Sequence, residues 1–122
     1  MLARANRVTR PADFRTAVRR GRRIGTSAVV LHVFERPAPD AASMKRPGSE
    51  PSRFGFIVTK AVGGAVTRNL VRRRLRSVSR DILPTVPAGT DIVMRALPGS
   101  EQVPWATLHA EIAEGLGRRA RG

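Results

Sequence analysis

The segment that decides the fold is KAVGGAVTRNLVRRRLRSVSR, residues 60–80. Four aliphatic residues between positions 71 and 82 share an arc of roughly 60° on a helix of about 100° per residue. These residues are Val71, Leu75, Val78 and Ile82. The pattern predicts a helix that follows the Gly63–Gly64 turn, ends before Pro84 and buries one narrow stripe against a core.

The same helix carries a second arc, about 140° wide, that consists almost entirely of arginine. Asp81 is the only acidic residue between Lys60 and Ile82. A face that meets only solvent is the alternative interpretation, but such faces interleave both signs, whereas rows of guanidinium groups favour an anionic ligand. The candidate contacts are Lys60, Arg68, Asn69, Arg72, Arg73, Arg76 and Arg80. Arg74 points elsewhere, and Leu70 interrupts the polar side.

The composition indicates one domain with a polyanionic partner. The chain has 122 residues, enough for one modest core. Its 23 Lys and Arg residues against 9 Asp and Glu residues leave a net charge of +14, which favours nucleic acid over an anionic membrane. The lack of cysteine excludes disulfides and thiolate metal sites. We find no apolar run of membrane-spanning length and no signal peptide, so we expect a cytoplasmic protein.

Helical and extended patterns alternate along the rest of the chain. Pro11 and Gly21 bound a short helix whose apolar face is Phe14, Ala17 and Val18. We expect extended segments at 22–35, 53–60 and 91–96, a last helix from 104, a basic arm at 1–9, a mobile proline-rich loop at 36–52 and a disordered tail at 117–122. The order α-β-β-β-α-β-α predicts a single α+β domain with helices packed on a small, mostly antiparallel sheet.

Two aromatic positions allow more than one interpretation. In the strand at 29–34, His32 shares a face with Val30 and Phe34 because alternate side chains take opposite faces. A single histidine in a strand is usually a packing residue, and a ligand or acid–base role is the alternative. The stripe of the last helix consists of Trp105, Leu108, Ile112 and Leu116. We interpret this stripe as core packing rather than a stacking or cofactor site.

No catalytic residues are predicted. Protein nucleases gather carboxylates around metal ions or use paired histidines. The nine acidic residues are scattered along this chain, and His32 and His109 share no motif. The glycines at 63–64 lack the Gly-Lys-Ser/Thr ending of a nucleotide-binding loop. The chain is therefore expected to bind a polyanion without a self-sufficient active site.

The segment at 59–76, TKAVGGAVTRNLVRRRLR, resembles the signature of the bacterial ribonuclease P protein component. The family pattern is Ser-Lys-Lys-Val-Gly-Asn-Ala-Val, then Arg-Asn-Arg, then Lys-Arg and Leu-Arg. This chain departs from the pattern at Ala61, Gly64 and Leu70, which replace Lys, Asn and Arg. Further similarities to the family lie at Asn6-Arg7, Asp13-Phe14, Gly21, Phe54-Gly55 and Asp91-Ile92-Val93.

The resemblance implies a role in tRNA maturation. In this family a catalytic RNA subunit, with Mg²⁺, removes the 5′ leader of precursor tRNA, and the arginine-rich helix of the protein binds that RNA. A groove lined here by Phe14, Val18 and His32 would hold the leader. The implied fold is ribosomal-protein-like, with a left-handed βαβ crossover that departs from the usual right-handed rule. The implied partners are the ribonuclease P RNA, in a 1:1 complex, and precursor tRNA, with neither DNA nor a membrane.

Other classes of protein share some of these features. A basic ribosomal or other RNA-binding protein without a processing role would have the same charge and the same helix. A sequence-specific DNA-binding protein is disfavoured because no second helix is turn-linked to the basic one. An interfacial membrane helix is disfavoured because the apolar stripe is narrow and aliphatic.

Overall fold

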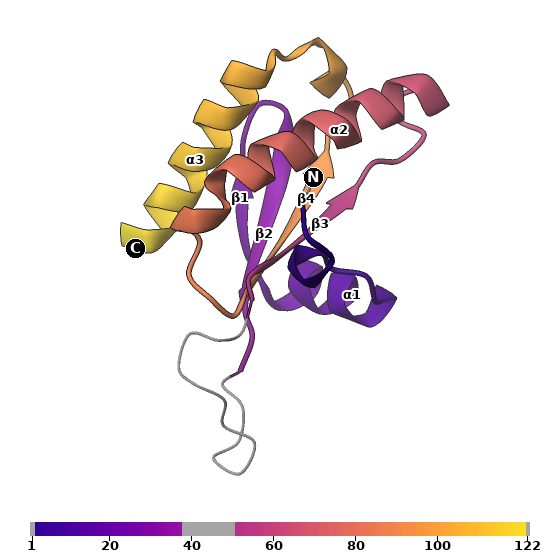
Figure 1. Ribbon diagram of the computed structural model, residues 1–122. Helices are drawn as coiled ribbons and strands as arrows, with labels where there is room; N and C mark the ends of the chain where they lie inside the picture. Colours follow the sequence, from indigo (N-terminus) through magenta and orange to yellow (C-terminus); the bar gives the residue numbers. More distant parts are fainter. Residues whose placement is uncertain (1, 38–50, 122) are drawn as a thin grey trace.

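The computed structural model describes residues 2–37 and 51–121. In chain order the elements are η1 (Arg4–Asn6), α1 (Pro11–Arg20), β1 (Arg22–Gly25), β2 (Val29–Glu35), β3 (Arg53–Ile57), α2 (Ala65–Ile82), η3 (Leu83–Thr85), β4 (Thr90–Ala96), η4 (Ser100–Gln102) and α3 (Trp105–Arg121). The four strands form one sheet, with α2 and α3 packed together at one end of the molecule and α1 at the other (Figure 1).

The strand order of the sheet is β1-β2-β4-β3. β2 is antiparallel to both β1 and β4, and β3 runs parallel to β4 at the edge. The predicted order of elements and the mostly antiparallel α+β sheet are therefore confirmed. α2 is the crossover between the two parallel neighbours β3 and β4, and the left-handed sense of this crossover stays a prediction from the resemblance.

The main core lies between the sheet and the helices α2 and α3. β2 contributes Val29, Leu31 and Val33 to this core, as its alternation requires. The predicted stripe of α2 is buried there, because each of its four members is at most 4% exposed. These members are Val71, Leu75, Val78 and Ile82. The helix is thus fixed to the sheet by its aliphatic side, which leaves the arginine side outward.

α3 differs from its sequence-based interpretation at both ends. Leu108 and Ile112 are buried in the core, and Leu116 packs against it. Trp105 is 39% exposed and lies outside the core cluster, so the interpretation of Trp105 as core is wrong. At the other end the helix continues to Arg121, where a disordered tail was predicted from 117.

The N-terminal segment lies along β3 rather than extending away as a basic arm. Leu2 and Val8 are buried. The backbone N–H of Val8 donates to the carbonyl oxygen of Phe54 at 2.9 Å, and Arg7 forms an isolated parallel bridge to the same residue. Most of the predicted loop at 36–52 falls at 38–50, outside the described residues.

The turn before α2 uses its two glycines differently. Gly63 has a φ of +154°, a conformation that side chains disfavour, and a Cβ there would lie 2.9 Å from Thr67 Cγ2. Gly64 is the N-cap of α2, with φ −72° and ψ −179° and open space where a Cβ would be placed. Only the first of these positions therefore requires glycine.

We expect opposite effects from substituting the two glycines. Gly64→Asn should raise the free energy of unfolding by about 0.5 kcal/mol, because asparagine caps the free N–H groups of the helix and restricts the unfolded chain. Gly63→Ala should lower it by about 1–2 kcal/mol through backbone strain. Urea unfolding followed by circular dichroism measures both changes. A shift of the same sign for both variants would contradict this assignment.

Candidate nucleic-acid interface

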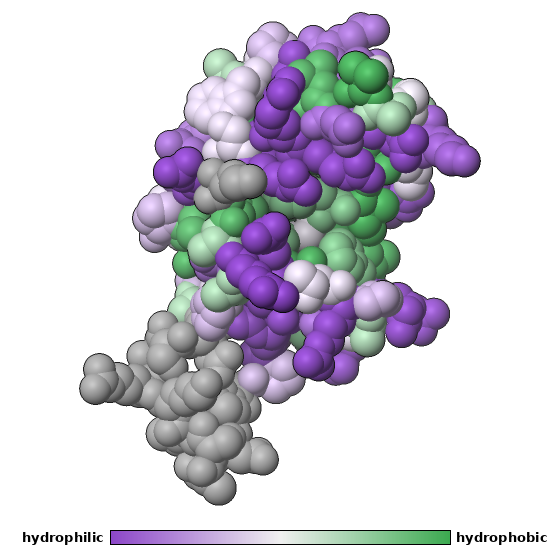
Figure 2. Space-filling model, turned by 45° about the vertical axis from the view of Figure 1, so that its right-hand side comes forward, coloured by the Kyte–Doolittle hydropathy of each residue, from purple (hydrophilic) through white to green (hydrophobic). Residues whose placement is uncertain are grey.

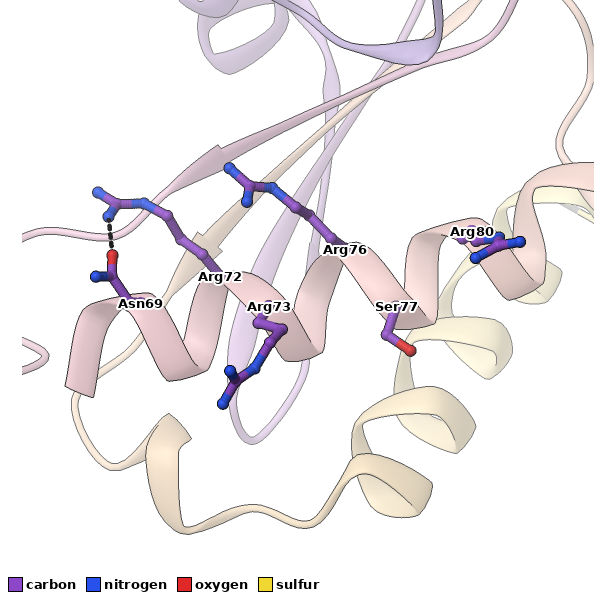
Figure 3. A pocket seen from close by; sticks show the side chains of 6 residues that line it. All are labelled: Asn69, Arg72, Arg73, Arg76, Ser77 and Arg80. Carbon is purple, nitrogen blue, oxygen red and sulfur yellow. Dashed lines mark hydrogen bonds between the residues drawn. The ribbon is translucent and has the colours of Figure 1, made fainter. Parts of the chain in front are cut away.

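The outward side of α2 carries a cationic stripe around an open hollow of about 600 Å³ (Figure 3). The residues that line it are Asn69, Arg72, Arg73, Arg76, Ser77 and Arg80. Their spacing of three and four residues places them on one face of the helix. Arg72 and Arg76 project from one side of this face, and Arg73 and Ser77 project from the other (Figure 3).

The arginines of the stripe have no carboxylate partners in the part of the chain that the structure describes. The ion pairs of the described residues lie outside the stripe: Arg36 with Asp91, Arg53 with Asp13 and Asp91, and His109 with Asp81. Like charges three or four residues apart on a helix repel by roughly 0.2–0.5 kcal/mol per pair. The stripe therefore accumulates repulsion that an anionic ligand would relieve.

Arg72 is an arginine of the stripe that hydrogen bonds within the protein orient. Its Nη1 donates to Asn69 Oδ1 at 3.3 Å, and its Nη2 donates to the carbonyl oxygen of Val58 at 3.4 Å. The second bond ties the guanidinium to the segment that follows β3. Arg72 is thereby held in place by uncharged oxygen acceptors rather than by a carboxylate.

Three other basic residues of this region behave differently from the stripe. Arg74 points elsewhere, as predicted, because its Nη1 donates to the carbonyl oxygens of Glu101 at 2.7 Å and Val103 at 3.2 Å. Lys60 and Arg68 were predicted to bind RNA with the stripe, but neither lines the hollow. Lys60 is exposed in the turn before α2, and Arg68 is half-buried with an Nε that lacks a partner.

The opposite face of the sheet, which we call the α1 face, brings together the residues predicted to hold a leader. Strand register aligns Arg23, His32, Val93 and Gly55 in one row across the four strands. Phe14 of α1 packs on the Gly55 end of this row, where an added Cβ would lie 2.6 Å from its ring. The Phe14 ring thus packs against the same row of the sheet to which His32 belongs.

The next row of the α1 face contains Val30, Arg95 and Ile57. Arg95 is exposed on this row, as Arg23 is on the row before it, and Val18 on α1 is 37% exposed. Figure 2 shows hydrophilic surface over α2 and over α1, with hydrophobic and pale surface in the recess between them. Sequence reasoning missed both Arg23 and Arg95, because only the register of the strands shows that they flank His32.

His32 is a neutral, nearly buried group on this face. It is 6% exposed, and its Nδ1 has no hydrogen-bond partner. Burial lowers the pKa of His32, and the positive charges of Arg23 and Arg95 lower this pKa further. Only a small part of the residue is therefore open to a ligand, near two cations.

Comparison with known proteins identifies the family. The family model described as Ribonuclease P matches residues 2–120. The ribonuclease P protein component of Clavibacter michiganensis is 50% identical over 121 residues, which cover 99% of this chain and 98% of that protein. This chain belongs to the ribonuclease P protein family. The ribonuclease P protein component of Salinispora tropica is 42% identical over 136 residues, which cover 99% of this chain and 100% of that protein.

Solved structures of ribonuclease P proteins have a similar fold. The ribonuclease P protein of Staphylococcus aureus matches with a TM-score of 0.74 at 19% identity, over 93% of this chain and 94% of that one. The protein from Thermotoga maritima matches with a TM-score of 0.73 at 22% identity, over 92% and 96%. At these identities the likeness concerns the fold alone. With the family established by sequence, the chain is the protein subunit of the endoribonuclease ribonuclease P, and its partner is the ribonuclease P RNA.

An ion-pair cluster that sequence reasoning missed fixes α1 of this ribonuclease P protein to the sheet. The Asp91 side chain is 3% exposed, contacts Arg36 and accepts hydrogen bonds from Arg53 Nε at 2.8 Å and Nη2 at 2.7 Å. Arg53 also lies 3.4 Å from Asp13 in the first turn of α1. The hydrogen bonds to Asp91 raise the pKa of Arg53, which stays charged. These arginines serve the fold rather than RNA binding.

The described residues contain no cluster of metal-ligating side chains. Among them, no three His, Cys, Asp or Glu side chains come together in a group that could hold a metal ion. Several acidic groups have other partners: Asp13 and Asp91 bind arginines, Asp81 contacts His109, and Glu111 accepts from Ser27. None of the described helices has both the length and the apolar character needed to cross a membrane.

The lowered pKa of His32 predicts how stability depends on pH. Because the folded pKa lies below the unfolded value of about 6.5, the unfolded chain takes up the proton first as pH falls. This contribution to stability is complete above pH 6.5 and is lost as pH falls below it. His32→Gln should reduce the loss of unfolding free energy on acidification, measured by urea unfolding at several pH values. Equal pH dependence in the variant and the parent protein would contradict the assignment.

Proposed function

We propose that the cationic stripe of α2 binds the ribonuclease P RNA and that the α1 face holds the single-stranded 5′ leader of precursor tRNA. The RNA subunit, with Mg²⁺, would then hydrolyse the phosphodiester bond at the 5′ end of the mature tRNA. The observation that carries this proposal is the stripe itself, whose arginines surround a hollow without a carboxylate partner in the described chain. The proposed complex contains one protein and one RNA and is cytoplasmic.

The stripe suits a folded RNA surface because it offers phosphate contacts without reading bases. Arg72, Arg76 and Arg80 recur every four residues, so their Cα atoms rise by roughly 6 Å along a rigid axis. Guanidinium groups bind phosphate oxygens through two parallel hydrogen bonds. Such contacts fix the position of a protein on RNA and add affinity with little dependence on sequence.

The α1 face suits a single strand of variable sequence. Arg23 and Arg95 are exposed on neighbouring rows and can each meet a backbone phosphate. Between them His32 is neutral, and Val18 contributes exposed apolar surface at the edge of α1. Bound phosphates would offset the two nearby positive charges. A strand can therefore be held by its backbone and by base contacts that tolerate any nucleotide.

In this proposal the protein supplies no reacting group. Mg²⁺ supplies the Lewis-acid chemistry when the holoenzyme is assembled, held mainly by the RNA subunit and the substrate. The protein neutralises phosphate where the two RNA molecules meet, which lowers the repulsion between them. It also adds contacts to the leader, which the leaderless product no longer offers, and so favours substrate over product.

We predict that Arg73→Ala combined with Arg76→Ala weakens binding to the ribonuclease P RNA by roughly 10- to 100-fold. Both side chains are exposed and make no hydrogen bond within the described protein, so their loss acts on the ligand. The slope of log K against log salt should fall in magnitude by about 2, one unit for each lost phosphate contact. Filter binding over a range of salt concentrations measures both effects.

Arg74→Ala is the matched control for this pair, because it removes a charge from the same helix outside the stripe. It should lower thermal stability and leave the salt slope nearly unchanged. If the Arg73→Ala, Arg76→Ala double variant keeps the salt slope of the parent protein, α2 does not bind RNA by this face. The same conclusion follows if Arg74→Ala lowers the slope by as much as each substitution in the stripe does.

For the leader, we predict that Arg23→Ala and Arg95→Ala each weaken holoenzyme binding to precursor tRNA by roughly 5- to 10-fold, the effect of losing one solvent-exposed contact worth about 1 kcal/mol. Binding to leaderless tRNA should change little. Arg22→Ala is the control, since Arg22 is exposed on the same strand but pairs with Val33 and so takes the opposite face. Titrations of the holoenzyme with labelled precursor and mature tRNA measure the ratio. Equal losses on both substrates would rule out a leader contact.

A further inference from the structure

Trp105 is a large aromatic side chain that the fold leaves accessible. It is the only tryptophan of the chain, and it is 39% exposed at the start of α3. The packing of α2 with α3 does not depend on it, because Leu108 and Ile112 fill the core one and two turns later. A residue that served only to join the two helices would bury its ring, so the exposure requires another explanation.

Contacts with two helices hold the Trp105 ring in place. Its Nε1 donates to Ser77 Oγ of α2 at 3.1 Å. Its ring centroid lies 5.0 Å from that of His109 on α3, with the planes tilted by 32°. His109 Nε2 in turn lies 2.6 Å from Asp81 Oδ2 of α2. The indole is thus positioned before any ligand arrives, and little side-chain entropy is lost on binding.

The anchoring residue of Trp105 belongs to the cationic stripe. Ser77 lines the hollow together with Arg73, Arg76 and Arg80, so the indole lies at the border of that hollow on the α3 side. A partner at this border meets an aromatic surface close to the positive charges that line the hollow. Unpaired nucleotides present this combination, a flat base attached to phosphates.

We propose that Trp105 is a stacking platform for an unpaired base of the ribonuclease P RNA, with the neighbouring phosphates in the cationic stripe. This inference rests on the proposed function and extends the RNA-binding surface from α2 onto α3. Double-stranded RNA keeps its bases inside the helix, so the platform selects a loop, bulge or junction. An acidic protein segment would satisfy the arginines but would leave the indole without a planar partner.

Intrinsic fluorescence tests the proposal directly. Since the chain has one tryptophan and no tyrosine, its indole emission comes from Trp105 alone. Titration of the full-length protein with ribonuclease P RNA should quench this emission, with the same Kd as filter binding gives on the same samples. Emission that stays unchanged while filter binding shows the complex would overturn the stacking proposal. Absence of a complex in the filter assay would instead overturn the proposed function.

Variants separate stacking from a structural role. Trp105→Leu should weaken RNA binding by roughly 5- to 100-fold, the effect of losing one stacked base, while the salt slope stays as in the parent protein. Trp105→Phe should keep most of the affinity because a ring remains. Circular dichroism confirms that each variant is folded. A folded Trp105→Leu protein with parental affinity would overturn the proposal, and the fluorescence titration of the parent protein decides the matter if that variant does not fold.

Discussion

The burial of the aliphatic stripe of α2 against the sheet is the interaction on which the rest of the structure depends. Four side chains are removed from water there, at roughly 1.5–3 kcal/mol each. Repulsion within the arginine rows opposes this by roughly 0.2–0.5 kcal/mol for each like-charged pair. Burial therefore exceeds repulsion, and α2 can form before RNA is present. The fold thus tolerates the positive charge to which, in our proposal, the RNA binds.

The sheet gives the protein two separate surfaces. α2 crosses from β3 to β4 on the core side, while α1 lies on the opposite face and is held there by Arg53 between Asp13 and Asp91. In the proposed function, the ribonuclease P RNA and the leader therefore contact different arginines of the same small domain. The buried Asp91 also keeps Arg36 and Arg53 out of both surfaces.

Patterns within single elements were sufficient to predict much of this fold and part of the site. The repeat at 71, 75, 78 and 82 predicted the buried side of α2, and the polar arc beside it predicted the members of the stripe except Ser77. Alternation in β2 placed His32 opposite the main core. Relations between elements were not accessible in this way. Arg23 and Arg95 flank His32 only because of strand register, and Asp91 meets Arg53 for the same reason.

Trp105 is a residue for which helical periodicity predicted the wrong environment. Its spacing with Leu108 and Ile112 predicts core, yet it lies at the first residue of α3, where its indole nitrogen donates to Ser77 of α2 and its ring stays outside the core. Helical periodicity states which residues share a side but not where along a helix its contact with the core begins. Arg68 shares the polar arc but lies half-buried near the start of α2 and does not line the hollow, so its RNA contact stays a prediction.

The most direct test of this account is a cleavage assay with precursor tRNA and a bacterial ribonuclease P RNA at a Mg²⁺ concentration too low for the RNA to act alone. The account predicts that the purified protein restores cleavage at the mature 5′ end and that the protein without RNA cuts nothing. Cleavage by the protein alone, or no stimulation of an RNA that it demonstrably binds, would contradict it.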